Sequence, residues 1–120
     1  MVYTADGLRR FVTEIGLART RELFLTGRAF DTRHALDIGL VNHVVSADDL
    51  MPLATRMAAA VAANAPMAIE GMRVVLRAIA DDDGADAKAQ QWRVKTFGSA
   101  DLAEGLAATR ERRAATFGGA

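Results

Sequence analysis

The sequence has no cysteine, two prolines and few aromatic residues, which are one tryptophan, one tyrosine and five phenylalanines in 120 positions. The absence of cysteine excludes disulfides, thiolate metal sites and a cysteine nucleophile. Hydrophobic residues make up 51% of the chain, and alanine supplies much of that share. Small apolar residues with few aromatics favour closely packed helices over a β-sandwich. We therefore expect a mainly α fold.

The sequence also lacks an excess of charge of either sign. Lysine plus arginine and aspartate plus glutamate both number 15, so the formal net charge is zero. No overall field attracts nucleic acid or an anionic membrane. No stretch approaches the ~20 apolar residues of a membrane span, and the N-terminus has no signal-peptide pattern. We expect a soluble cytoplasmic protein without a nucleic-acid or membrane partner.

Glycines mark the expected turn and helix ends in the first part of the chain. Asp6-Gly7 predicts a turn, and two helices are expected over 8–15 and about 17–26, separated by Gly16. Gly27 suits the left-handed position that follows a helix. The N-terminal third is thus expected to hold a loop followed by two short helices.

The next segment, 25–45, contains residues typical of a helix start, a helix end and a strand. Asp31 is a good N-cap for a helix over 32–38, because its carboxylate can accept from the free amides of the first turn. Gly39 is expected at the left-handed end of that helix, with Leu40 packing back over it in a Schellman arrangement. The β-branched residues of 41–45 predict a short strand.

Four further helices are expected in the remaining chain. The first begins near Asp48 or Asp49, which places Pro52 in its first turn. The second has Pro66 at its first position, the third covers about 85–97, and Ser99 caps the last. The 3.6-residue period gives the helix after Pro66 one apolar stripe, formed by Ile69, Met72, Leu76 and Ile79.

Candidate chemistry is sparse. His34 and His43 have no carboxylate partners at ligand spacing, so surface histidines are favoured over a metal or base pair. The acidic run 81–84 lacks the alternating ligands of a calcium loop and is interpreted as a solvated turn. The basic run 110–113 has two interpretations, a solvated helix end or a phosphate contact. No metal site is expected.

Three stretches carry a family resemblance. They are "ELFLTGRAFDTRHALDIGLVNHVV" (22–45), "AANAPMAI" (62–69) and "GSADLAEGLAATRERRAATFGG" (98–119). In order and spacing they resemble the enoyl-CoA hydratase/isomerase (crotonase) family, over nearly the whole chain. The resemblance implies the C-terminal helical part of a ClpP/crotonase-like α/β fold. Residues 1–45 would end the core, with the short strand, and 46–120 would form the helical cap and oligomerisation region.

The resemblance also implies what is missing. A full family member is roughly twice this length, and its N-terminal half supplies the two amides of the oxyanion hole and the first acid/base glutamate. The second glutamate precedes a turn that "VYTADG" resembles, so it would fall ahead of Met1. One oxyanion donor is worth ~10²–10³ in turnover and acid-base catalysis ~10²–10⁴. The chain is expected to be inactive alone, with a coenzyme A thioester as substrate and no cofactor.

A few residues match the family's functional positions. In the glycine turn the resemblance gives substrate-binding roles to Tyr3, Thr4 and Gly7. Asp6 replaces the first of two family glycines and is either a catalytic carboxylate or a turn-forming or capping residue. Arg112 matches a basic residue that reaches the CoA of a neighbouring subunit, where an arginine can hold phosphate with two donors.

Three functions remain open from the sequence. The chain is a truncated or split acyl-CoA enzyme, a stand-alone helical oligomerisation or regulatory module that pairs with crotonase homologues, or an unrelated helical binding protein such as a helix-turn-helix reader. Neutral charge weighs against the last. Helices that have lost a β-core partner would expose an apolar patch. We therefore expect a homo-oligomer or association with a crotonase-like chain.

Overall fold

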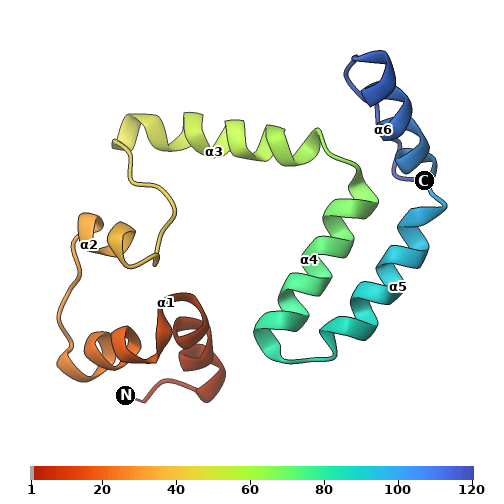
Figure 1. The fold of residues 1–120 in the computed structure, drawn as a ribbon. Coiled ribbons are helices and arrows are strands. Elements are labelled where there is room, and N and C mark those ends of the chain that lie inside the picture. The colour runs from red at the N-terminus through yellow and green to blue at the C-terminus, as the bar shows by residue number, and fades with distance from the viewer. Residues whose placement is uncertain (1) are drawn as a thin grey trace. The chain divides into compact units, whose positions relative to one another are not determined.

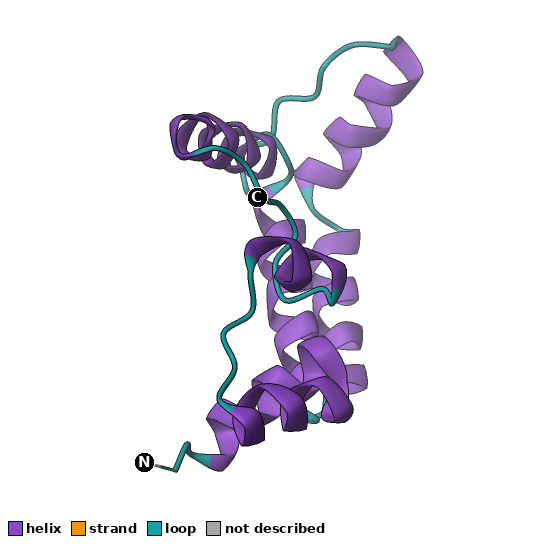
Figure 2. Ribbon diagram, turned by 90° about the vertical axis from the view of Figure 1, so that its left-hand side faces the viewer, coloured by secondary structure: helices purple, strands orange, loops and turns teal. Residues whose placement is uncertain are grey.

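A computed structural model describes residues 2–120, which form helices and no strand (Figures 1 and 2). The chain divides into two compact units, one ending at Leu50 and the other covering Met51–Ala120, and each is described by itself. The helices are α1 (Ala5–Thr26), α2 (Thr32–Asp37), α3 (Ala47–Ala62), α4 (Pro66–Asp81), α5 (Ala85–Phe97) and α6 (Ala100–Glu111). The expectation of a mainly α chain is confirmed.

Helix α1 is two arms joined at a glycine. Gly16 has φ 80° and ψ 161°, outside the helical region, so the predicted break is confirmed. Gly27, with φ 63°, ends the second arm in the predicted left-handed conformation. The predicted turn at Asp6-Gly7 is wrong, because the Thr4 hydroxyl accepts from the Gly7 amide and starts the helix three residues earlier than expected.

The bend in α1 brings aromatic side chains from both arms together. The ring of Phe24 meets the edges of Tyr3 and Phe11, with centroids 4.9 Å apart in each pair. Ile15, just before the bend, and Thr20, just after it, are both buried. These side chains pack the two arms of α1 against each other.

Helix α2 ends as the sequence predicts. Asp31 accepts from the His34 amide at 2.7 Å, and Gly39 has φ 78°. The Leu40 amide donates to the carbonyl of Ala35 at 2.9 Å, which closes the Schellman motif. The strand predicted over 41–45 is wrong, since these residues form irregular exposed chain. A strand needs a neighbour for its backbone hydrogen bonds, and β-branched composition alone supplies none.

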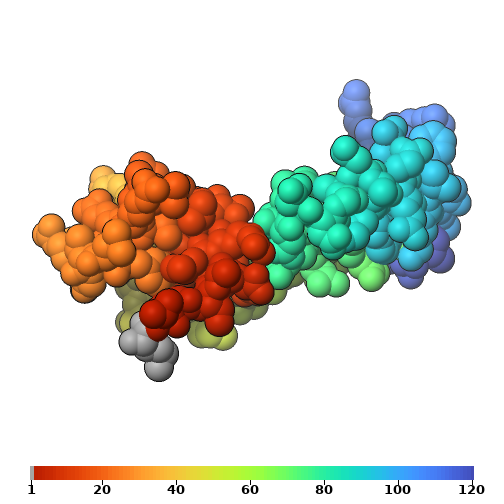
Figure 3. Space-filling view, turned by 90° about the horizontal axis from the view of Figure 1, so that it is seen from below, coloured from red at the N-terminus to blue at the C-terminus, as the bar shows by residue number. Residues whose placement is uncertain are grey.

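The second unit is built on α4 and α5, which run in opposite directions in Figure 1 and lie side by side, as the space-filling view of Figure 3 also shows. Buried Gly71 of α4 lies against the indole of Trp92 on α5. Gly71 therefore faces the partner helix, whereas the predicted apolar stripe is largely exposed. Three of its members are 61–65% exposed: Met72, Leu76 and Ile79.

The starts of α4 and α6 follow the prediction, and α3 starts close to its predicted position. Ser46 accepts from the Asp49 amide at 3.1 Å, and α3 begins one residue earlier than expected, which places Pro52 inside the helix. Pro66 stands at the start of α4, and Ser99 caps α6 through the Leu102 amide. Among residues 2–120 no single helix has the length and apolar character of a membrane span. Helices α3 and α4 meet those criteria only as a pair bent by 108°.

Candidate functional site

The segment Tyr3–Gly7, given a substrate-binding role by resemblance, forms the start of α1. Thr4 is the N-cap, and its hydroxyl accepts from the Gly7 amide at 3.2 Å. A Cβ atom added to Gly7 would lie 3.3 Å from that hydroxyl oxygen, so glycine permits the close approach. Tyr3 lies on Phe24 yet keeps 58% of its surface exposed. Tyr3, Thr4 and Gly7 are thus brought together as one capped helix start.

Asp6 lies in the first turn of α1. Its carboxylate forms an exposed ion pair with Arg9 at 3.0 Å, one helical turn away. An acid in the first turn also complements the positive end of the helix dipole. Asp6 therefore has a local ion-pair partner at the helix start.

The basic run at the end of α6 has an unusual backbone. Arg112 is left-handed, with φ 54°, at the position where glycine is most common. The Arg112 amide donates to Thr109 at 3.4 Å, and the Arg113 amide donates to Ala108 at 3.0 Å. The chain therefore reverses at Arg112 and runs back along α6. We name residues 113–120 the C-terminal strap.

Two carboxylates of α6 hold the C-terminal strap. Glu104 accepts two hydrogen bonds from the Arg113 guanidinium, at 2.6 and 2.8 Å, and one from the Thr116 amide at 2.8 Å. The Arg113 guanidinium, with help from the Thr116 amide, holds the pKa of Glu104 at about 2. Arg113 also pairs with Glu111 at 2.6 Å, and these carboxylates raise its own pKa.

The far end of the strap is fixed by Asp101. This carboxylate is only 4% exposed and accepts from the amides of Gly118 and Gly119, at 2.8 to 3.1 Å. The Asp101 amide in turn donates to the carbonyl of Ala120 at 3.2 Å. Between the two carboxylates, the ring of Phe117 covers Gly105. Each end of the strap is therefore held by its own carboxylate on α6.

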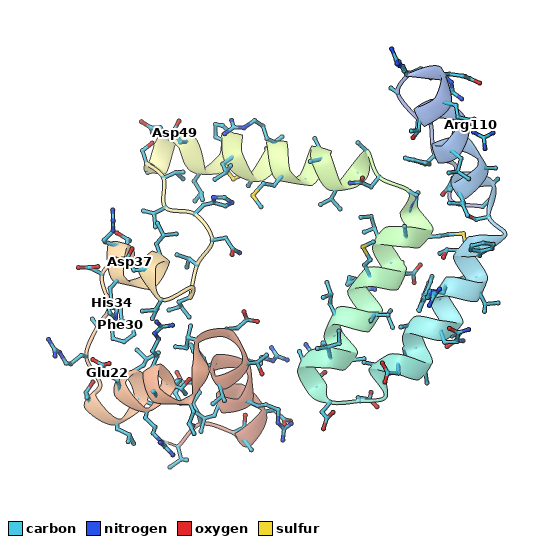
Figure 4. All side chains as sticks on the ribbon, viewed as in Figure 1. Glu22, Phe30, His34, Asp37, Asp49 and Arg110 are labelled. Atoms are coloured by element: carbon cyan, nitrogen blue, oxygen red, sulfur yellow. The ribbon has the colours of Figure 1, made fainter. Side chains whose placement is uncertain are left out.

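The four residues of the basic run have different partners. Arg113 and Glu111 are engaged in the ion pairs just described. Within residues 2–120, no ion pair joins Arg110 or Arg112 to an acid, and both residues are exposed. Arg110 projects from α6 in Figure 4. These two guanidiniums are the cations of the run that a phosphate group can reach.

An apolar groove of about 520 Å³ lies where α4, α5, α6 and the strap meet. Its charged members are Arg93 and Asp101. Trp92, next to Arg93, packs on Gly71, and the Lys95 ammonium lies 4.3 Å from the centre of its ring. The apolar lining comes from Ala65, Met67, Ala68, Phe97, Leu102, Gly105, Leu106 and Phe117.

Of the remaining polar candidates, His34 and Asp83 have local partners. The His34 ring packs edge-on against Phe30, 4.5 Å between centres (Figure 4), and His43 is exposed. In the acidic turn, Asp83 pairs with Lys88 at 2.6 Å, and the hydrogen bond and charge of Lys88 lower the pKa of Asp83. Across residues 2–120, no three histidine, aspartate or glutamate side chains gather as a possible metal site.

The sequence located Arg112 at the end of α6 but missed the residues that hold it. Glu104 and Arg113 are nine positions apart, so they are not neighbours on one helix face. Only the reversal of the chain at Arg112 brings them together. The left-handed arginine itself has no marker in a single sequence, because glycine is the residue that normally signals such a position.

Comparison with known proteins gives a consistent result. A family model described as enoyl-CoA hydratase/isomerase matches residues 2–120. The Bacillus subtilis protein YngF is 35% identical over 117 residues, 96% of this chain and 45% of YngF. Methylmalonyl-CoA decarboxylase of Escherichia coli is 27% identical over 121 residues, 98% of this chain and 46% of that protein.

Solved structures agree with the sequence comparison. The crystal structure of an enoyl-CoA hydratase/carnithine racemase from Magnetospirillum magneticum superposes with a TM-score of 0.88 at 28% identity. The superposition covers 100% of this chain and 45% of that one. The chain thus spans about half the length of the relatives and structures that it matches.

Proposed function

The chain belongs to the enoyl-CoA hydratase/isomerase family, and from this premise we propose that it supplies the C-terminal helical part of a site for acyl-CoA thioesters. A second segment, equivalent to the rest of its relatives, completes that site. One observation carries the proposal: 96% of the chain matches YngF, yet the match covers 45% of YngF.

Arg112 is the residue of this chain that we assign to the ligand. It is exposed and has no acidic partner among the described residues, and its guanidinium can offer two parallel donors to a phosphate. Tyr3, Thr4 and Gly7 contribute the capped helix start, whose first amides have no partner within the helix. We assign this start to the acyl-thioester end of the substrate, on the strength of the family resemblance.

The class of reaction is proposed only as acyl-CoA thioester chemistry. The relatives include a methylmalonyl-CoA decarboxylase as well as enoyl-CoA hydratases. Asp6 pairs with Arg9 and Glu104 with Arg113, so both acids have local structural partners. The proposal therefore places the oxyanion hole and the acid/base groups on the completing segment.

The test is hydration of crotonyl-CoA, followed at the thioester absorbance. The purified 120-residue chain is assayed alone and after mixing with the part of YngF that precedes the matched region, and that part alone is the control. Turnover at the buffer level for each piece, and well above it for the mixture, supports the proposal. Turnover by the 120-residue chain alone contradicts it and makes Asp6 the first residue to substitute.

A second candidate, a regulatory or oligomerisation module, is favoured by the exposed bulky stripe Met72, Leu76 and Ile79 on α4. Such a module would bind a full-length homologue without completing a site. Stable co-purification with YngF, together with no CoA affinity and no turnover in the mixture, is the result that favours it.

A further inference from the structure

The backbone at Arg112 carries a conformational cost. Arg112 and Asp82 are the two non-glycine residues with positive φ within residues 2–120. Aspartate tolerates the left-handed region through local hydrogen bonds, whereas arginine has no such compensation. Strained residues of this kind persist where the surrounding structure fixes them, and they cluster at ligand-binding positions.

The structure fixes Arg112 from the C-terminal side. Directly after it, Arg113 is held by both oxygens of Glu104, and the same carboxylate holds the Thr116 amide. Asp101 then secures the end of the C-terminal strap through Gly118 and Gly119. Because the chain is tied to α6 at these points, the reversal at Arg112 is retained despite its cost.

The adjacent arginines, Arg112 and Arg113, differ in their hydrogen-bond partners. The Arg113 guanidinium donates hydrogen bonds to Glu104, Glu111 and the Ala114 carbonyl. Arg112 is exposed and paired with no acid of the described residues. One arginine therefore holds the turn and the other is left for a ligand.

We propose that Glu104 and Arg113 are positioning residues, which hold the left-handed turn so that the Arg112 guanidinium is presented to a phosphate group of the CoA thioester. This inference rests on the proposed function, which supplies the ligand. We name the Glu104–Arg113 ion pair the clamp. When this ion pair is broken, the turn is no longer held, and the Arg112 side chain adopts many conformations. Phosphate affinity falls although no ligand contact has been removed.

The left-handed backbone provides a discriminating variant. Arg112→Gly removes the guanidinium and the steric strain together, so we expect the midpoint of thermal unfolding to rise by about 2–5 °C. The same variant should bind CoA about tenfold more weakly, the usual value of one charge-assisted hydrogen bond. Higher stability with weaker binding marks a strained residue retained for a ligand.

The experiment is calorimetric titration of the 120-residue chain, mixed with the part of YngF that precedes the matched region, with CoA and with pantetheine, which lacks the phosphates. Glu104→Gln should weaken CoA binding about three- to tenfold, leave pantetheine binding unchanged, and speed amide exchange at Arg113 and Gly118. Arg113→Lys keeps the charge but not the two-donor geometry and should fall between. Asp37→Asn, which removes an exposed ion pair of α2, is the matched control and should leave CoA affinity unchanged.

The outcomes separate the two proposals. If the unaltered chain binds CoA no better than pantetheine, the phosphate assignment of the proposed function fails, and the positioning inference fails with it. If the chain binds CoA and Glu104→Gln binds equally well despite faster exchange, the clamp is merely structural and only the positioning inference is overturned. A lower unfolding midpoint for Arg112→Gly refutes the strain on which the inference depends.

Discussion

Substitution of Gly71 by alanine tests the packing of α4 on α5 most directly. A Cβ atom at Gly71 would lie 2.9 Å from Cε3, 3.0 Å from Cδ2 and 3.2 Å from Cγ of Trp92. The last two atoms are at the root of the indole rather than at its flexible end, so the ring cannot simply swing away. Either the two helices separate or the tryptophan leaves its rotamer.

Two opposing terms set the magnitude. Glycine to alanine inside a helix gains about 1 kcal/mol of helix propensity. Overpacking a close contact costs about 1–3 kcal/mol. We expect Gly71→Ala to lower the free energy of unfolding by roughly 1 kcal/mol, and the loss to shrink in a Trp92→Phe background, where the smaller ring leaves space.

Gly105 is the matched control. It also lies inside a helix, but its added Cβ would approach Phe117 no closer than 3.6 Å, an ordinary contact. Gly105→Ala should therefore gain about 1 kcal/mol. Urea unfolding with a shared m-value measures both variants. If Gly71→Ala stabilises the chain as much as Gly105→Ala does, the close packing of Trp92 on α4 is refuted.

Two further predictions concern acid and association. The pKa of Glu104 is about 2 in the folded chain against an ordinary 4.5, so its stabilisation is complete above pH 4.5 and disappears as the pH falls toward 2. The unfolding midpoints of the unaltered chain and Glu104→Gln should converge over that range, and a constant gap would contradict the clamp. The exposed stripe of α4 predicts self-association, which sedimentation at micromolar concentration checks; a single monomer boundary would contradict it.

Several helix starts and the break within α1 were predictable from the sequence. Asp31, Ser99 and Pro66 each mark a helix start, and each does so because its chemistry acts within one turn of the chain. The break at Gly16 has the same origin, since glycine readily adopts φ values closed to other residues. These features need no knowledge of what packs against them.

The features that the sequence did not predict depend on contacts between residues far apart in the chain. The bulky residues of α4 have helical spacing, yet Trp92 selects the small face with Gly71, and that choice cannot be read from α4 alone. The strand predicted over 41–45 has the composition for pairing, but no strand among the described residues pairs with it. The clamp of Glu104 on Arg113 likewise depends on a chain reversal that has no sequence marker.

The exposed area of the chain bears on the proposed function. Two isolated compact units of the observed sizes would together expose roughly 7,500 Å², whereas the chain exposes 9394 Å². The excess of roughly 1,900 Å² is about twice the ~800 Å² that one partner contributes to a standard protein–protein interface. Within the second unit, the apolar stripe of α4 is a surface of this kind, because Met72, Leu76 and Ile79 are largely exposed. A completing segment that covers this stripe would bury Met72, Leu76 and Ile79 and lower the exposed area accordingly.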